Sequence, residues 1–325
     1  MGTRALRAVS FPLVSETTGP RRALDSRDPR LYQIGALSAL LGYGMTALSF
    51  DVTPARAALL LGSALATQYA CTRIWRLPSF EPKSALISGL SLCLLLRTND
   101  ASLAVGAAAL AVGSKFLLRW NGKHVFNPTT FGLAAVILAT RRAWVSPGQW
   151  GAPAFFGFLV ACLGGLVVLR AGRADVTLAF LGGYAGLLLA RSAWLGEPLA
   201  IPLHRLQSGA LLLFSFFMIS DPKTTPDTRE GRILFGLLVA FGAAFVQFRL
   251  FRPSGPIWAL FALSPLTPLL DRILPGRRYD WAFPKGVSDE TRASVPGLLP
   301  VALRGEPSGP PVLRVLRGEG RREAL

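Results

Sequence analysis

LYQIGALSALLGYGMTALSF, residues 31–50, contains no charged side chain. A helix of this length rises about 30 Å, which matches the thickness of the hydrocarbon core of a bilayer. Similar apolar runs follow one another as far as Leu274, and they lack the polar face that helices of soluble proteins carry. The chain is therefore predicted to be an all-α membrane protein with several crossings.

We expect about ten transmembrane helices. The expected spans are residues 31–50, 57–75, 84–96, 102–118, 127–139, 152–169, 176–195, 204–219, 232–251 and 256–274. Lys and Arg are more frequent in the loops that share a side with the two arginine-rich ends. By the positive-inside rule, we place both termini in the cytoplasm and the protein in the inner (plasma) membrane.

The net charge of +17 does not indicate nucleic-acid binding, because the charges lie in the ends and the short loops. We interpret them as signals of orientation and as contacts with anionic lipid. Cys71, Cys93 and Cys162 are far apart, and no C-x-x-C pair occurs. No metal site is expected, and the cysteines are interpreted as apolar packing residues.

Two of the expected spans are too short for a full crossing. Residues 84–96 and 127–139 are each thirteen residues long; the first runs into Arg97-Thr98-Asn99-Asp100 and the second begins with Asn127-Pro128. Short spans at matching places in two halves of a membrane protein indicate broken helices around a site near the midplane.

The two halves of the chain also share short motifs. Ser-Gly-Leu at position 88 matches Ser-Gly-Ala at position 208, and Phe-Asn-Pro at 126 matches Phe-Arg-Pro at 251. Five spans per half is an odd number, so the second repeat is expected to be inverted. The predicted organisation is an N-terminal cytoplasmic tail (1–30), a first five-helix repeat (31–139), a connection (140–151), a second five-helix repeat (152–274) and a disordered cytoplasmic tail (275–325).

The segment from Gly122 to Thr130 is the most distinctive polar element. Asn127 is a good N-cap and Pro128 suits the first helical position, so the free amides of that turn are predicted to face a ligand with negative charge or carbonyl groups. An ordinary capped helix start remains the alternative.

A second polar element, Asp221 to Pro226, ends an apolar run. Its hydroxyls and its lysine are suited to a phosphate or a partner's loop, and a simple polar turn at the membrane surface remains the alternative. The candidate binding residues from both elements are Gly122, Lys123, Asn127, Pro128, Thr129, Thr130, Asp221, Thr224 and Thr225.

No catalytic residue is predicted, because the sequence contains no nucleophile–base arrangement, P-loop or dinucleotide fingerprint. Lys115 and Arg191 fall near the ends of spans, so their side chains are expected to snorkel to the membrane surface. His124 is expected to be an interfacial residue.

These motifs, together with DPRLYQI at position 28 and PLTPLLDRI at position 265, resemble the RnfD/NqrB family. Its members are membrane subunits of Rnf electron-transport complexes and of the sodium-pumping NADH:quinone oxidoreductase. The resemblance covers about residues 28–274. It implies ten helices in two inverted repeats, flavin cofactors, and electron transfer coupled to ion movement.

The chain departs from that family at one point. Typical members bind FMN covalently through the threonine of a Ser-Gly-Ala-Thr string in the connection between the halves, and residues 140–151 contain no such string. We therefore predict a non-covalent flavin, either FMN or riboflavin, and no covalent FMN. In this respect the chain resembles the short RnfD-like proteins that accompany enediyne biosynthesis genes.

The predicted function is that of a membrane subunit of a flavin-dependent electron-transport complex, with other membrane subunits as partners, rather than a stand-alone catalyst. The sequence does not indicate whether sodium ions or protons are moved. One alternative is a small-solute or ion channel or transporter built on the same scaffold. Another is an accessory membrane protein of a biosynthetic cluster.

Overall fold

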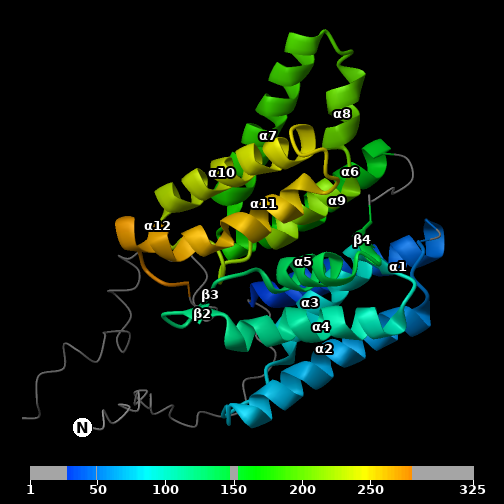
Figure 1. Ribbon diagram of the computed structural model, residues 1–325, viewed down its shortest axis with the longest axis vertical. Helices are drawn as coiled ribbons and strands as arrows, with labels where there is room; N and C mark the ends of the chain where they lie inside the picture. The colour runs from blue at the N-terminus through cyan, green and yellow to red at the C-terminus, as the bar shows by residue number, and fades with distance from the viewer. Residues whose placement is uncertain (1–27, 49, 147–152, 280–325) are drawn as a thin grey trace, which may run out of the picture. The chain divides into compact units, whose positions relative to one another are not determined.

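The computed structural model describes residues 28–48, 50–146 and 153–279, without side chains for residues 153–159, and is mainly helical (Figure 1). The predicted tails therefore lie largely outside the described residues. Asp28, at the end of the predicted N-terminal tail, caps the first helix by accepting a hydrogen bond from the Arg30 backbone N–H at 3.0 Å. The described residues belong to one compact unit.

The first half of the chain contains five helices and four short strands. The helices are α1 (Pro29–Ala47), α2 (Pro54–Ile74), α3 (Pro82–Leu95), α4 (Ala101–Leu117) and α5 (Pro128–Thr140). The strands are β1 (Leu96–Thr98), β2 (Arg119–Trp120), β3 (Lys123–His124) and β4 (Ala143–Val145). Strand β1 pairs antiparallel with β4, and β2 pairs antiparallel with β3.

The second half consists of helical segments within its described residues. They are α6 (Pro153–Ala171), α7 (Ala174–Leu195), α8 (Ala200–Leu206), α9 (Gly209–Leu213), the π-helical turn η1 (Phe214–Met218), α10 (Arg229–Phe248), α11 (Gly255–Leu263), the 3₁₀ turn η2 (Ser264–Leu266) and α12 (Thr267–Ile273).

The two short helices predicted from the sequence are confirmed. Helix α3 has 14 residues and α5 has 13. Two predicted single spans are wrong: residues 204–219 are divided among α8, α9 and η1, and residues 256–274 among α11, η2 and α12. The last break coincides with Ser264-Pro265, where proline lacks the N–H that an uninterrupted helix requires.

Within the described residues, α7 and α10 are the two helices both long and apolar enough to cross a membrane by length and composition. Several shorter apolar helices accompany them, including α3, α4 and α5. These lengths fit a helical membrane protein. The number of ten spans stays a prediction.

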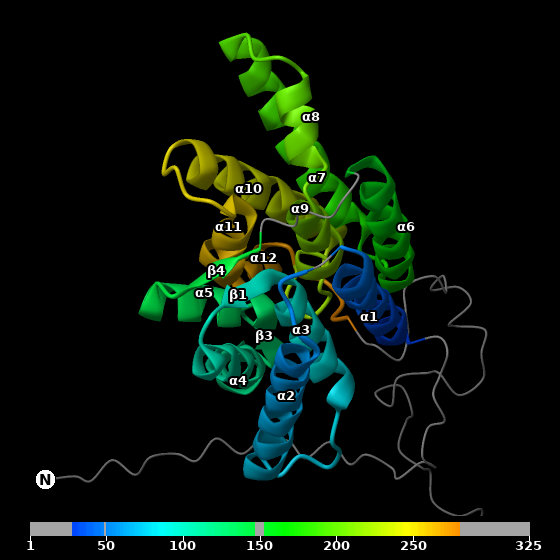
Figure 2. The same cartoon turned by 90° about the vertical axis from the view of Figure 1, so that its right-hand side faces the viewer.

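Helix contacts follow the same order in the two halves. In the first half α1 packs on α3, α2 on α4 and α4 on α5; in the second, α6 packs on α9, α7 on α10 and α10 on α11. Between the halves, α1 packs on α6 and α5 on α11, and Figure 2 shows α1 beside α6. This order is the one expected of two related repeats, although the inverted repeat itself stays a prediction.

Small residues allow the closest of these helix contacts. A Cβ atom on Gly132 of α5 would lie 2.5 Å from the Ala107 carbonyl oxygen of α4. A Cβ atom on Gly236 of α10 would lie 2.9 Å from the Val176 carbonyl oxygen of α7. Close packing of small residues is the usual way in which helices associate within a bilayer.

Candidate functional site

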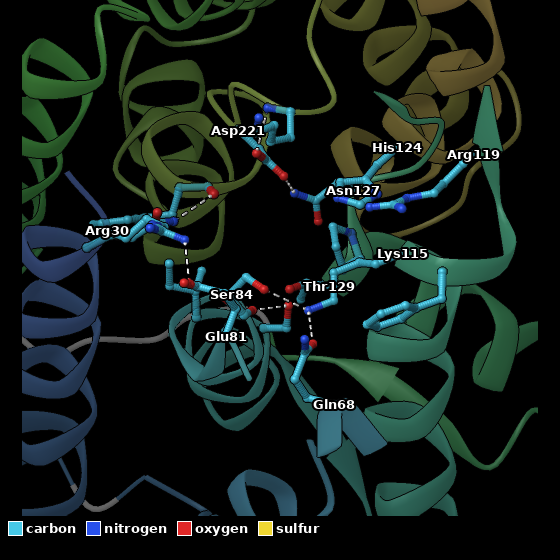
Figure 3. A pocket seen from close by; sticks show the side chains of 18 of the residues that line it. Arg30, Gln68, Glu81, Ser84, Lys115, Arg119, His124, Asn127, Thr129 and Asp221 are labelled. Atoms are coloured by element: carbon cyan, nitrogen blue, oxygen red, sulfur yellow. Dashed lines mark hydrogen bonds and ion pairs between the residues drawn. The ribbon is translucent and has the colours of Figure 1, made fainter. Parts of the chain in front are cut away.

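A cavity of about 350 Å³ lies where broken helices from both halves meet (Figure 3). Its wall is formed by α1, α2, α3, α4, β3, α5, η1 and the loop after η1. The polar residues that line it are Arg30, Gln33, Gln68, Ser79, Glu81, Ser84, Ser88, Ser91, Lys115, Arg119, His124, Asn127, Thr129, Asp221 and Lys223. Apolar side chains, including Ile87, Phe116 and Phe217, complete the lining.

Asn127 joins the two polar elements predicted from the sequence. It caps α5 as predicted, because its Oδ1 accepts a hydrogen bond from the Thr130 backbone N–H at 3.1 Å. Its Nδ2 donates to the Met218 carbonyl oxygen at 3.2 Å and to Asp221 Oδ2 at 3.5 Å. One side chain therefore holds the start of α5 against the end of η1.

The loop after η1 is a tight polar turn around Asp221. The Asp221 carboxylate accepts a hydrogen bond from the Lys223 backbone N–H at 3.0 Å. The Asp221 carbonyl oxygen accepts bonds from the backbone N–H groups of Thr224 and Thr225, each at 3.2 Å, and from the Thr225 hydroxyl at 3.1 Å. The threonines thus stabilise the turn, and the carboxylate is left at the cavity wall.

The helix before this loop ends in a π-helical turn, η1. The Ile219 backbone N–H bonds to the Phe214 carbonyl oxygen at 3.0 Å, five residues earlier. The Ser215 carbonyl oxygen accepts a bond from the Thr177 hydroxyl at 2.9 Å. Such π turns are frequent at functional sites, where they shift the register of the residues that follow.

The prediction for Lys115 is wrong. Its side chain does not extend to a membrane surface but points into the cavity, with 5% of the residue exposed. Lys115 Nζ donates to Gln68 Oε1 at 3.2 Å and to Ser84 Oγ at 3.1 Å. Arg191, which was given the same interpretation, lies outside the cavity lining and pairs with Glu197 at 2.7 Å.

The nine candidate residues do not all come together. Asn127, Pro128, Thr129 and Asp221 line the cavity. Gly122 lies in the β2–β3 turn with φ of 76°, and Thr130 is fully buried behind the cap. Lys123 is engaged in a separate cluster, where its ammonium pairs with Asp227 at 3.0 Å and Asp271 at 2.7 Å.

Sequence reasoning missed much of the cavity wall. Gln68 was not predicted as a lining residue. Nor were the three serines on one face of α3, namely Ser84, Ser88 and Ser91. Spacings of four and three residues place these serines on one side of a helix. That pattern, inside an otherwise apolar span, is the signal that could have identified them.

His124 also lines the cavity, from strand β3. Burial, reinforced by the positive charges of Arg119, Lys115 and Lys223, lowers the pKa of its imidazole to about 3. The imidazole is therefore neutral at physiological pH. Its Nδ1 is buried and makes no hydrogen bond within the described part of the chain.

No cluster of three or more metal-ligating side chains occurs among the described residues. The cavity instead offers ammonium, amide and hydroxyl groups beside aromatic and aliphatic walls. This combination is suited to an organic ligand with polar edges, because most small-molecule sites are apolar pockets with a few placed polar groups.

The mainly helical architecture, with the two long apolar helices α7 and α10, is consistent with the class of helical membrane proteins. The model of the NQR2, RnfD, RnfE family matches residues 143–280 of this chain. These residues run from β4 through the whole described second half. The family match therefore includes the π turn and the Asp221 loop.

Individual relatives are the RnfD proteins of ion-translocating oxidoreductase complexes. The RnfD protein of Stutzerimonas stutzeri is 28% identical over 297 residues, covering 68% of this chain and 83% of that protein. The RnfD protein of Escherichia coli (strain ATCC 8739 / Crooks) is 35% identical over 139 residues, covering 42% of this chain and 35% of that protein. That of strain K12 / DH10B is 31% identical over the same length.

These matches confirm the predicted relationship to the RnfD/NqrB family. They also support a location in a membrane. The resemblance to the proteins that accompany enediyne biosynthesis genes stays a prediction.

Proposed function

We propose that this chain is a membrane subunit of an electron-transport complex and that it holds a non-covalent flavin in the cavity between α3, α4, α5 and η1. The relatives that belong to ion-translocating oxidoreductase complexes support the first part. The second part depends on one observation, namely that Asn127 and Asp221 meet at one cavity together with Lys115.

The lining residues fit a flavin. A volume of about 350 Å³ falls within the range of about 300–1,000 Å³ that is typical of small-molecule sites. Phe116, Phe217 and Ile87 provide apolar faces for a flat ring system, and Lys115, Gln68 and Asn127 provide donors for its carbonyl oxygens and ring nitrogens. A bound flavin supplies the redox chemistry, while these residues bind it, orient it and set the charge around it.

In this proposal the chain has ten spans in two inverted repeats, its termini lie in the cytoplasm, and other membrane subunits surround it. The corresponding order of helix contacts in the two halves supports the repeats. We further propose that no FMN is attached covalently, since residues 140–151 contain no Ser-Gly-Ala-Thr string.

Purified full-length protein tests the site. A stoichiometric flavin, released by denaturation without mass added to the polypeptide, is the expected result. Asn127→Ala removes the link between α5 and the Asp221 loop and is expected to lower the flavin content several-fold. Arg191→Gln, which alters an ion pair outside the cavity lining, serves as control. An unchanged flavin content in Asn127→Ala would refute this site.

A channel or transporter is the second candidate, because a smaller cavity of about 100 Å³ lies at the other end of α3, lined by Cys93 and Arg97. Ser84, Ser88 and Ser91 of α3 line the larger cavity and follow one another along the helix toward the smaller cavity. A colourless protein that admits a small solute into liposomes without any electron donor would favour this function over electron transfer.

A further inference from the structure

Lys115 is a buried ammonium group whose two hydrogen-bond acceptors are both uncharged. Its Nζ contacts the amide oxygen of Gln68 and the hydroxyl of Ser84, and Figure 3 shows it pointing into the middle of the cavity. An ammonium carries three N–H donors, and the cavity lies on its open side.

Two other buried cations of this protein are paired with carboxylates, whereas the buried Arg97 and Arg173 donate to backbone carbonyl oxygens. Lys123 contacts Asp227 and Asp271, and Arg232 contacts both oxygens of Asp175. Lys115 makes no ion pair within the described residues, although it is as buried as these groups. A buried charge without a counter-charge is costly, so proteins normally provide one.

Asp221 interacts electrostatically with Lys115 across the cavity but does not contact it. It is the carboxylate of the cavity wall, but its oxygens accept hydrogen bonds from the Lys223 backbone and from Asn127. No hydrogen bond or ion pair joins it to Lys115 in the part of the chain that the structure describes. Glu81, the other acidic lining residue, pairs with Arg30 at 3.2 Å.

The remaining wall is also positive. Arg119 and Lys223 line the cavity with Arg30 and Lys115, and the lining carboxylates are Glu81 and Asp221. Arg30 also pairs with Asp28 at 2.8 Å, so the excess positive charge comes from the other three cations. The first turn of α5, at Pro128 and Thr129, faces the same space. Its backbone amides add the partial positive charge of a helix N-terminus.

From this arrangement we propose that the cavity binds a phosphate-type oxyanion against the ammonium of Lys115. The inference rests on the proposed flavin site for its biological ligand: the phosphate monoester of FMN would contact Lys115, and the site would discriminate FMN from riboflavin, which lacks that group. The binding of an oxyanion as such does not depend on the flavin.

The first experiment uses inorganic phosphate and the purified full-length protein. Phosphate is expected to raise the Tm of the wild type by roughly 2–4 °C over chloride at equal ionic strength, once its concentration is several times its Kd. Phosphate also stabilises proteins generally by exclusion from their surface, and Lys115→Gln is expected to retain only this background. The increase in Tm above that background is the phosphate effect.

A second variant guards against a folding defect in Lys115→Gln. Gln68→Glu keeps the shape of the side chain and places a carboxylate beside Lys115, so the phosphate effect is expected to vanish while the Tm in chloride is maintained. Gln207→Glu, at an exposed position after α8, is the matched control and is expected to keep the effect. An equal phosphate effect in wild type and Gln68→Glu would overturn the proposal.

The second experiment compares flavins. The wild type is expected to bind FMN at least about tenfold more tightly than riboflavin, because only FMN can make a charge-assisted contact with Lys115. Gln68→Glu is expected to remove that preference. Equal affinity in the wild type would overturn the inference while leaving a flavin site intact. A phosphate effect without binding of either flavin would refute the proposed function and keep the oxyanion site.

Discussion

The chain is interrupted at two comparable points, after α3 and after η1, and the two breaks are built differently. After α3, Leu96–Thr98 turns into strand β1 and pairs with β4, while the buried Arg97 donates to the carbonyl oxygens of Cys93 and Leu96 at 3.1 and 2.9 Å. The Leu95 carbonyl oxygen accepts from the Ser146 backbone N–H at 2.7 Å, so this helix end is satisfied within the first half of the chain. A cavity of about 100 Å³ remains beside it.

After η1 local bonds are joined by a contact from the other half. The Met218 carbonyl oxygen accepts from the nearby Asp221 backbone N–H at 3.3 Å. It also accepts from Asn127, which lies 91 residues earlier in the chain. Because the partner belongs to another element, the break opens onto the larger cavity. The comparison indicates that a helix break opens onto a site when its polar groups are shared between the two halves rather than satisfied within one of them.

The largest effect is expected for the ion pair between Arg232 and Asp175 in the second half of the chain. Arg232→Met removes the partner of Asp175 and the donor to the Asp227 carbonyl oxygen, at 2.8 Å. The partly buried Asp175 carboxylate then keeps only its bond from the Val176 backbone N–H, and the free energy of unfolding is expected to fall by about 3 kcal/mol. Denaturant unfolding of the purified protein measures this loss.

The double variant Arg232→Met with Asp175→Asn is the control for that pair. Since it removes both charges, its loss should be clearly smaller than the sum of the two single losses. Additive losses would show that the pair contributes nothing as a pair.

At the first break, Arg97→Met leaves two carbonyl oxygens without their donor. The expected loss of unfolding free energy is about 2 kcal/mol, the usual cost of unsatisfied buried groups. Ligand binding in the larger cavity should not change, because Arg97 does not line it. A loss of flavin or phosphate binding in this variant would contradict the separation of the two breaks.

Close helix packing in the first half is tested by Gly132→Ala. The added Cβ meets the Ala107 carbonyl oxygen and the Ala111 side chain, so overpacking of about 1–2 kcal/mol is expected. Gly113→Ala is the matched control in α4, since a Cβ there meets nothing within 4 Å. Equal stabilities of the two variants would show that α4 and α5 are free to separate.

The smallest effect near pH 7 is expected for His124. Its pKa is about 3 in the folded protein, lowered mainly by burial, against 6.5 for the ordinary group. The unfolded chain therefore binds one more proton between these values, and the contribution to stability is full above pH 6.5 and falls as the pH is lowered. His124→Gln should flatten this acid-side slope by up to one proton while changing stability little at neutral pH.

The sequence predicted several parts of this architecture correctly. The short helices α3 and α5 were predicted because apolar run length and flanking polar residues report helix ends directly. Asn127 was predicted as the cap because asparagine before proline supplies both the acceptor and a first residue that needs no partner. The break within residues 204–219 was missed, although the polar pair Gln207-Ser208 lies between α8 and α9. The π turn was missed because it continues an apolar run.

Run length, caps and proline positions operate within one or two helical turns, and so the sequence alone determined the class of the protein and the ends of the short helices α3 and α5. Whether a polar side chain lies at a surface or in a cavity was decided by the tertiary structure. Lys115 could be assigned to a surface until Gln68 and Ser84, 47 and 31 residues away along the chain, were brought beside it. A cavity is formed by distant elements, and its charge depends on which of their side chains meet there.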